Sequence, residues 1–325
     1  MMNSSQVSYF TLTAYLDSGA LKYLYFTVVV FLYIVIVTAN VLLIVVICVN
    51  RSLHEPMYMF LCSLFVNELY GSTGLFPFLL LQILSDVHTV SAPLCFLQIF
   101  CLYTYANLQL SNLAIMSYDR YLAICCPLHY HTRMSSSKVS MLIALMWLSP
   151  FLAISVVIYL SAPLQLCGNI INKVYCDNNS IVKLACSDTT ANNVYGVLGA
   201  IFITISSVSL ILYTYMRILK VCFSGSKQTR QKAISTCTPH LASLLNFSCG
   251  SFFDTAQNRS NMNHVPNMLR TLLSLYWLIC PPLFNPLLYG LNLTKIRIIC
   301  KGLIFVKCRC LMLKFRQGSA LVKRK

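Results

Sequence analysis

Seven long apolar segments separated by short polar or charged links dominate the hydropathy pattern of this chain. A helix that crosses a bilayer needs about 20 apolar residues, and each segment is long enough. The apolar runs are continuous rather than alternating, which favours helices over the strands of a membrane barrel. We therefore predict an all-α membrane protein built as a seven-transmembrane helix bundle. The predicted spans are 24–49, 57–84, 95–126, 138–160, 193–222, 235–255 and 267–291.

The composition supports a membrane environment. The chain has 325 residues, of which 58% are hydrophobic and only 10% are charged. A soluble domain carries about a quarter charged residues, so this chain lacks the polar surface that water requires. It shows no internal repeat, and the inverted-repeat architecture of many transporters therefore has no support.

The basic residues orient the predicted bundle. The net charge is +16, and 19 of the 24 Lys and Arg residues fall on one side if the amino terminus lies outside. This asymmetry is the one expected for cytoplasmic loops, so we attribute the charge to topology and anionic lipid rather than to nucleic acid. We predict an extracellular tail (1–23) with a glycosylation sequon at Asn3, a seven-span domain (24–291), and a cytoplasmic amphipathic helix with a basic tail (292–325).

The cysteines divide between the two sides of the membrane. Four of the 16 lie on the predicted outer side, where disulfides are plausible. They are Cys95, Cys167, Cys176 and Cys186, and the residues alone leave three pairings open. On the cytoplasmic side, Cys300, Cys308 and Cys310 follow the last span, where reversible acylation and free thiols are both open.

Five short motifs carry a resemblance to a known family. In chain order they run from the start of the second span to the end of the seventh, and the resemblance covers essentially the whole chain except the two tails. They are 53–58 (LHEPMY), 116–125 (MSYDRYLAIC), 183–189 (KLACSDT), 232–241 (KAISTCTPHL) and 282–289 (PLFNPLLY). The chain resembles the olfactory (odorant) receptor family of rhodopsin-like, class A G-protein-coupled receptors.

The resemblance implies a plasma-membrane receptor for a small odorant, coupled to a stimulatory heterotrimeric G protein that raises cyclic AMP. Two alternatives stay open, namely a rhodopsin-like receptor for another ligand and, with less support, a transporter. We predict no enzyme, cofactor or metal site, because no nucleophile–base set or metal-ligand spacing occurs. The histidines His54, His129, His131 and His240 are interpreted as loop or helix-end residues.

A candidate switch lies at the cytoplasmic end of the predicted bundle. Asp119 and Arg120 are adjacent at a membrane edge, where ionisable residues are functional candidates, and Arg120 offers a five-donor fork to a second partner. Pro286 removes a backbone hydrogen bond and predicts a break or hinge; an anchoring ion pair and a static kink are the simpler alternatives. By resemblance the coupling set comprises Asp119, Arg120, Tyr121, Tyr215, Asn285, Pro286 and Tyr289, with Tyr215 and Tyr289 facing one cytoplasmic cavity.

The resemblance also implies two disulfides, Cys95–Cys176 and Cys167–Cys186. We expect buried polar residues at Asn40, Glu68 and Gln109. The chain departs from the family here, because Glu68 stands where Asp is usual and Gln109 where Glu is usual. An ion- or proton-linked role of that pair therefore does not carry over. Ser248 stands where the family usually has an aromatic residue.

We place the ligand in the outer half of the bundle, since pockets in helical bundles form between helices. An amine ligand is disfavoured, because Leu102 stands where amine receptors carry Asp. Arg259 near the outer mouth could bind a carboxylate or an amino acid, although a solvated loop arginine is the simpler interpretation. The candidate pocket residues are Leu102, Tyr103, Ala106, Asn107, Gly199, Ala200, Ile203, Thr204, Ser248, Ser251, Phe252, Thr255 and Arg259.

Overall fold

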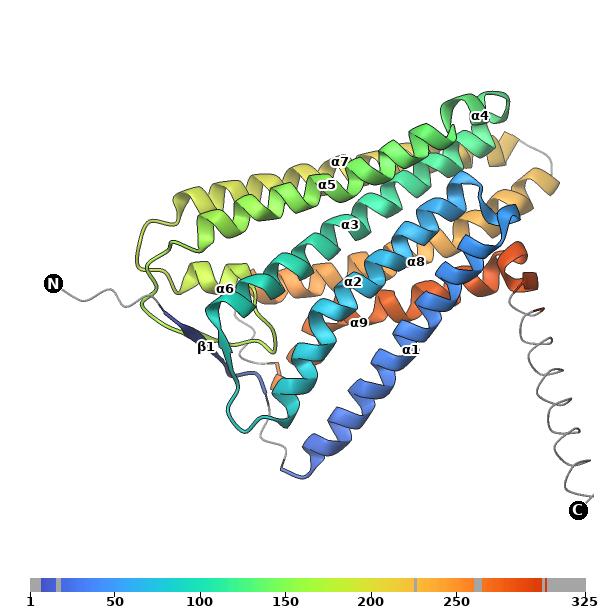
Figure 1. The fold of residues 1–325 in the computed structure, drawn as a ribbon. Helices are drawn as coiled ribbons and strands as arrows, with labels where there is room; N and C mark the ends of the chain where they lie inside the picture. The colour runs from blue at the N-terminus through green and yellow to red at the C-terminus, as the bar shows by residue number, and fades with distance from the viewer. Residues whose placement is uncertain (1–6, 16–18, 225–226, 260–264, 300–301, 303–325) are drawn as a thin grey trace, which may run out of the picture.

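Long helices packed side by side form the body of the protein in a computed structural model (Figure 1). The structure describes residues 7–15, 19–224, 227–259, 265–299 and 302. Within these ranges every predicted span is helical. The long helices are α1 (Leu21–Val49), α2 (Pro56–Leu84), α3 (Ala92–Cys125), α5 (Ser136–Ser161), α7 (Thr190–Ser224), α8 (Lys227–Arg259) and α9 (Asn267–Asn292).

The helix ends differ most from prediction in α8, which begins at Lys227 rather than near residue 235. The first turns of α8 are polar and basic, so hydropathy gave no signal there, although Lys, Gln and Ala are good helix formers. Short helices connect the long ones: η1 (Arg51–Leu53), η2 (Pro127–His129), α4 (Tyr130–Arg133) and α6 (Asn178–Lys183). Residues 294–299 are helical after α9. Asn3, Cys300, Cys308, Cys310 and most of the predicted amphipathic helix lie outside the described residues.

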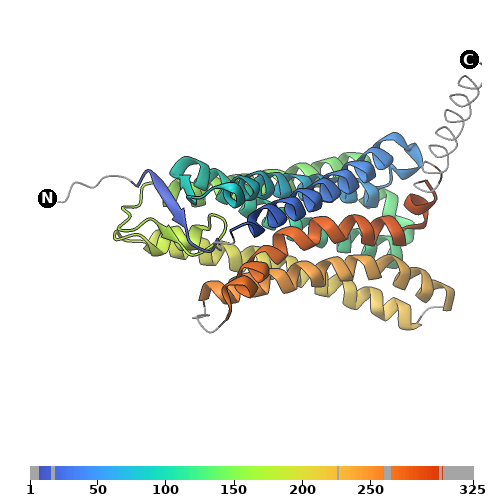
Figure 2. The same cartoon turned by 90° about the horizontal axis from the view of Figure 1, so that it is seen from below.

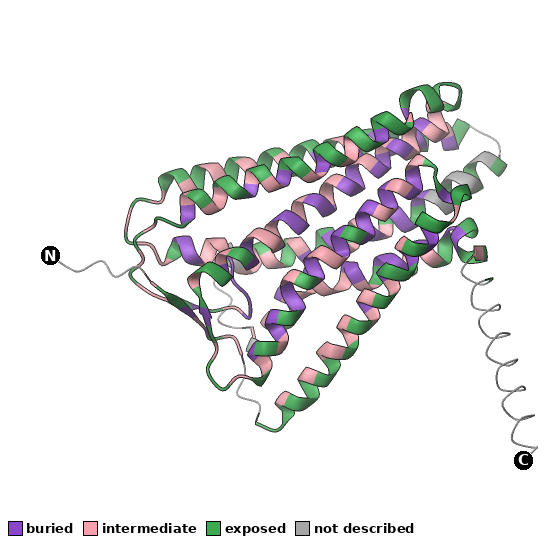
Figure 3. Ribbon diagram, in the orientation of Figure 1, coloured by how far each residue is buried: buried purple, intermediate pink, exposed green. Residues whose placement is uncertain are grey.

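Two of the long helices are less apolar than the others. Five helices in the described part are long and apolar enough to cross a membrane, namely α1, α2, α5, α7 and α9, and α3 and α8 fall short. Polar side chains such as Gln109 and Asn112 on α3 are fully buried, because α3 packs against α2, α5, α7 and α8. Buried residues accordingly line α3, whereas many positions on α1 and α7 are exposed (Figure 3). Protein surrounds α3, so its polar residues face neighbouring helices rather than lipid.

The seventh long helix, α9, continues through three prolines. The predicted break of the helix at Pro286 is therefore wrong. Proline has no N–H, so Pro286 leaves the carbonyl of the residue four positions earlier, Pro282, without its helical donor. Asn40 of α1 supplies the missing donor at 3.0 Å from the Pro282 oxygen. The predicted buried polar residue Asn40 thus binds α1 to α9 at the point where proline weakens the helix.

The sequence analysis missed a small sheet at one end of the bundle. We call this end the outer end, and the opposite end, where α3 stops at Cys125, the inner end, after the predicted orientation. Strand β1 (Tyr9–Leu12) lies between β2 (Thr89–Ser91) and β3 (Ile170–Ile171), antiparallel to β2 and parallel to β3. The side chains of Phe10 and Leu12, both in β1, are almost completely buried. The view in Figure 2 shows the strand at the end of the bundle opposite the one where α9 ends. Part of the predicted tail is therefore a structural cap.

Two disulfides fix the long loop before α7. Cys95 at the start of α3 is bonded to Cys176, and Cys167 is bonded to Cys186. These are the pairs that the family resemblance implied. The first bond holds the loop segment around Cys176 against α3, where Cys176 is fully buried.

We predict that Cys95→Ser abolishes expression at the cell surface. The substitution removes the tie between α3 and the loop, and a disulfide of this kind contributes about 2–4 kcal/mol to folding. Flow cytometry of intact cells with a tag on the outer side measures the effect. Cys48→Ser, which changes a free and exposed thiol, is the matched control. Normal surface levels of the Cys95→Ser protein would contradict the prediction.

Candidate functional site

The ion pair predicted at the end of α3 is present and nearly enclosed. Asp119 is fully buried, and Arg120 binds its carboxylate through Nη2 and, at 3.1 Å, through Nε. The Tyr130 hydroxyl of α4 donates to the other Asp119 oxygen at 2.8 Å. Burial and the Asp119 carboxylate raise the pKa of Tyr130, so its phenol stays protonated and keeps donating. Asp119 thus holds Arg120 on its own helix.

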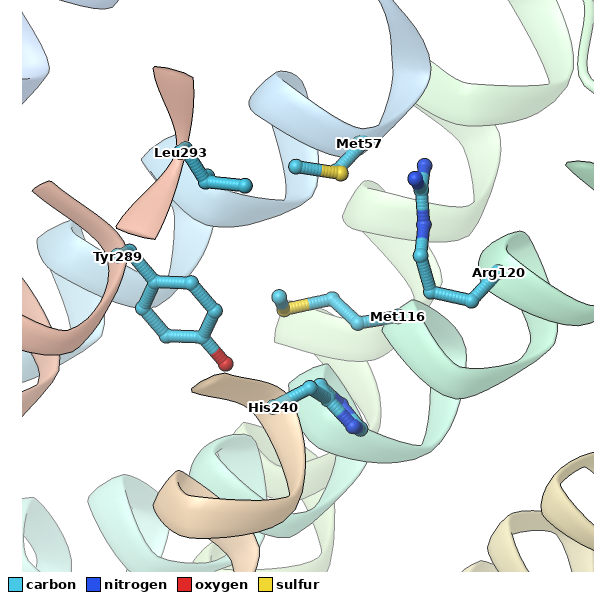
Figure 4. A pocket seen from close by; sticks show the side chains of 6 residues that line it. All are labelled: Met57, Met116, Arg120, His240, Tyr289 and Leu293. Atoms are coloured by element: carbon cyan, nitrogen blue, oxygen red, sulfur yellow. The ribbon is translucent and has the colours of Figure 1, made fainter. Parts of the chain in front are cut away.

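A small cavity opens beside this pair, at the inner end of the bundle (Figure 4). It is lined by side chains from α2, α3, α8 and α9 and by Leu293, which follows α9: Met57, Met116, Arg120, His240, Tyr289 and Leu293. Two of the predicted coupling residues, Arg120 and Tyr289, therefore share one cavity. The Tyr289 hydroxyl is buried and has no hydrogen-bond partner in the described part of the chain.

His240 joins three helices next to this cavity. Its Nε2 lies 2.8 Å from the Leu113 backbone oxygen of α3, which can only accept a hydrogen bond, so Nε2 carries the proton. The other ring nitrogen, Nδ1, then accepts from the Tyr215 hydroxyl of α7. Since His240 belongs to α8, one neutral imidazole binds the inner halves of α3, α7 and α8 together.

The sequence analysis placed His240 at a helix end, and the structure corrects this: His240 lies well inside α8 and is buried. The error follows from the late predicted start of α8. Tyr215 was predicted at this cavity and lies against His240. Tyr121, by contrast, does not line the cavity, and its ring edge lies against Tyr213 of α7.

A second polar cluster lies in the middle of the bundle around Glu68, which is fully buried. Its carboxylate accepts hydrogen bonds from Gln109 Nε2 at 2.9 Å, from the Tyr105 hydroxyl at 3.1 Å and from Asn285. All three partners act as donors to the two carboxyl oxygens. The predicted buried residues Glu68 and Gln109 are therefore in direct contact, and Asn285 ties α9 to α2 and α3.

The predicted ligand residues on α3 lie in the outer half of the bundle. Leu102 is buried and Ala106 is half-buried. The Tyr103 hydroxyl donates to Asp177 of the outer loop at 2.8 Å, and the Asn107 amide donates to its own helix at the Tyr103 carbonyl. On α7, Gly199 and Ile203 are half-buried, whereas Ala200 and Thr204 are exposed.

The predicted ligand residues on α8 do not join those on α3. Phe252 is 69% exposed, and Ser248 and Thr255 are also exposed, while Ser251 is half-buried. The inner face of α8 carries Phe247 and Gly250 instead. The prediction chose the wrong face because α8 has no clear apolar side in its outer half. The Arg259 side chain lies outside the described residues.

Three polar residues of the outer mouth were missed. Tyr175 of the outer loop is only 1% exposed and packs in one cluster with Leu102 and Trp277. Its hydroxyl donates to Asp254 Oδ1 of α8 at 2.9 Å, and Lys173 Nζ lies 3.0 Å from the same oxygen. Asp254 could have been found, because an ionisable residue within a predicted span is a functional candidate. The sequence holds no comparable sign that Tyr175, a loop residue, turns into the bundle.

Comparisons with known proteins agree on family and fold. The family model described as olfactory receptor matches residues 29–307. Human olfactory receptor 10R2 is 34% identical over 293 residues, covering 89% of this chain and 86% of that receptor. Mouse olfactory receptor 4B13 is 30% identical, covering 91% of this chain and 96% of that receptor. Squid rhodopsin, at 15% identity, has the same fold with a TM-score of 0.73 and 92% of each chain covered.

We predict that Glu68→Ala destabilises the folded bundle by at least about 3 kcal/mol. Three buried donors lose their acceptor, and a buried donor left without a partner costs about 1–3 kcal/mol. Thermal unfolding in detergent measures the loss. The control is Glu55→Ala, which removes an exposed ion pair with Lys295 and should cost less than about 1 kcal/mol. Equal stability of the two variants would refute the role given to Glu68.

Proposed function

Because this chain belongs to the olfactory receptor family of G-protein-coupled receptors, we propose that it detects a small odorant in the outer half of its bundle and raises cyclic AMP through a stimulatory G protein. The family and the rhodopsin fold make it an odorant-sensing receptor. The ligand site, the type of G protein and the second messenger are our proposal.

The contact of His240 with Leu113 and Tyr215 carries the proposal. It joins the inner halves of α3, α7 and α8 beside Arg120, and in our proposal this contact opens when a G protein engages Arg120. Two states follow, one with the contact closed and one with α7 and α8 moved away from α3. A ligand shifts their populations only as far as it binds one state more tightly than the other.

The receptor is a multi-pass protein of the plasma membrane. We propose that its amino terminus is extracellular and its carboxyl terminus cytoplasmic. The excess of Lys and Arg on one side supports this orientation. The two disulfides support it too, because they lie at the end of the bundle that would face the oxidising exterior.

The ligand site is proposed around Leu102, Tyr103, Ala106 and Asn107 of α3, facing the outer loop. Leu102 gives this region an apolar wall, and Tyr103 brings a hydroxyl to it. Such a combination suits a small molecule with an apolar body and one or two polar groups. The finer proposal, that the ligand is a carboxylate or an amino acid, depends on Arg259.

We predict that Arg120→Ala abolishes the cyclic AMP response while odorant binding is retained, because the variant lacks the guanidinium that the G protein would bind. A panel of odorants applied to cells with a cyclic AMP reporter measures the response. Arg133→Ala alters an exposed arginine on nearby α4 and should respond normally. A full response from Arg120→Ala would remove Arg120 from the coupling mechanism.

We predict that Arg259→Ala raises the half-maximal concentration of carboxylic acid odorants about tenfold or more. A hydrogen bond to a charged group contributes about 1.5–3 kcal/mol, which corresponds to that change. Alcohols of the same chain length serve as control ligands, since they do not need the guanidinium. If acids and alcohols act equally well on the variant and the wild type, the carboxylate proposal is wrong.

A further inference from the structure

The outer loop reaches α8 through one compact set of contacts. Lys173 Nζ lies 3.0 Å from Asp254 Oδ1 of α8 and 3.7 Å from Asp177 Oδ2 of the loop. The Tyr175 hydroxyl donates to the same Asp254 oxygen at 2.9 Å, and the Lys173 ammonium lies 5.1 Å from the centre of the Tyr175 ring. One carboxylate oxygen of α8 therefore receives two donors from the loop.

This contact is sheltered from water. The side chains of Lys173 and Asp254 are 10% and 15% exposed, and Tyr175 is buried. A charge pair removed from water interacts more strongly than a surface pair, and breaking it by losing one partner is costly. By comparison, the Lys22–Asp86 pair at 2.8 Å is open to solvent, with Asp86 89% exposed. The two pairs have the same chemistry but different surroundings.

The loop side of the contact cannot drift away from the bundle. Cys176, which follows Tyr175, is bonded to Cys95 of α3, and Asp177 is held by the Tyr103 hydroxyl and by the Ser180 N–H. Lys173 and Tyr175 are therefore held near α3 through their neighbours Cys176 and Asp177. A contact between them and Asp254 fixes the outer part of α8 relative to α3.

The same helix carries the contact that closes the inner end. Asp254 and His240 both belong to α8, which is one continuous helix. Between them, Gly250 lies so close to α9 that an added Cβ would be 2.7 Å from the Trp277 Cβ. With a rise of 1.5 Å per residue, Asp254 is about 6 Å and His240 about 15 Å along the helix from Gly250. A tilt of α8 about this close approach moves both ends.

We propose that Lys173 and Asp254, with the Tyr175 hydroxyl, form a latch through which the outer loop holds α8 in the state whose inner end is closed. Both ends are closed in the same structure, so tilting α8 to free His240 displaces Asp254 from its partners. A ligand beside Leu102 touches the cluster that contains Tyr175, and it opens the latch by shifting Tyr175. The latch deepens the proposed function and rests on it.

The experiment compares Lys173→Asp, Asp254→Lys and the double charge exchange. Each single variant puts like charges together, so we expect basal cyclic AMP per surface receptor to rise about fivefold or more, the lower end of coupling between distant sites. The double variant restores opposite charges and should return the signal toward the wild-type level. Lys173→Gln and Asp254→Asn, which only remove a charge, replace single variants that do not reach the surface.

The exposed pair provides the matched control. Lys22→Asp, Asp86→Lys and their combination change the same residue types at the outer end without touching α8. Their basal signal should equal that of the wild type. An equal rise from these variants, or a double exchange at Lys173 and Asp254 that restores nothing, would overturn the latch.

A readout without a G protein separates the latch from the proposed function. Cys237 on α8 is buried among residues of α3 and α7, and opening of the inner end exposes it. In membranes without G protein, we expect N-ethylmaleimide to label Cys237 faster in the single variants, with Cys62 of α2 as the reference thiol. Faster labelling without a rise in cyclic AMP would keep the latch and refute the stimulatory coupling. Unchanged labelling would overturn the latch.

Discussion

Every backbone polar group inside the bilayer must find its partner within the protein, and a buried side chain is costly unless it is hydrogen-bonded. These two constraints explain the main contacts between the helices. Pro286 frees one carbonyl of α9, and Asn40 of α1 satisfies it. Glu68 needs donors, and α3 and α9 provide them. His240 needs a donor and an acceptor, which come from α7 and α3. The bundle is therefore specified by a few buried polar contacts, whereas its apolar surface packs with little direction.

These contacts connect three levels of the molecule. The inner end holds Arg120 and the His240 contact, the middle holds the Glu68 cluster, and the outer end holds the loop with Tyr175 and Lys173. Helix α3 takes part at each level through Leu113, Gln109 and Tyr103, so a shift of α3 changes all three. A receptor that carries a signal across a membrane requires such a mechanical link between its two ends.

The sequence predicted the helices and their order, because runs of about 20 apolar residues have few other structures available. Motifs around Asp119 and Asn285 pointed to Arg120 and Tyr289, which line one cavity, and family resemblance implied the two disulfide pairs. The sequence could not reveal which face of α8 turns inward, because its outer half mixes Ser248, Phe252 and Asp254 without a dominant apolar side. It also hid β1, since the alternation of Phe10 and Leu12 spans only four residues.

The pairing of β1 also limits the order of assembly during synthesis. Thr11 lies beside Ile170 in the sheet, although the whole of the first four long helices separates them in the chain. The ribosome must therefore complete more than half of the chain before its first strand can find this neighbour. Until then Phe10 and Leu12 lack the part of their apolar cover that comes from Ile171 and Ile181.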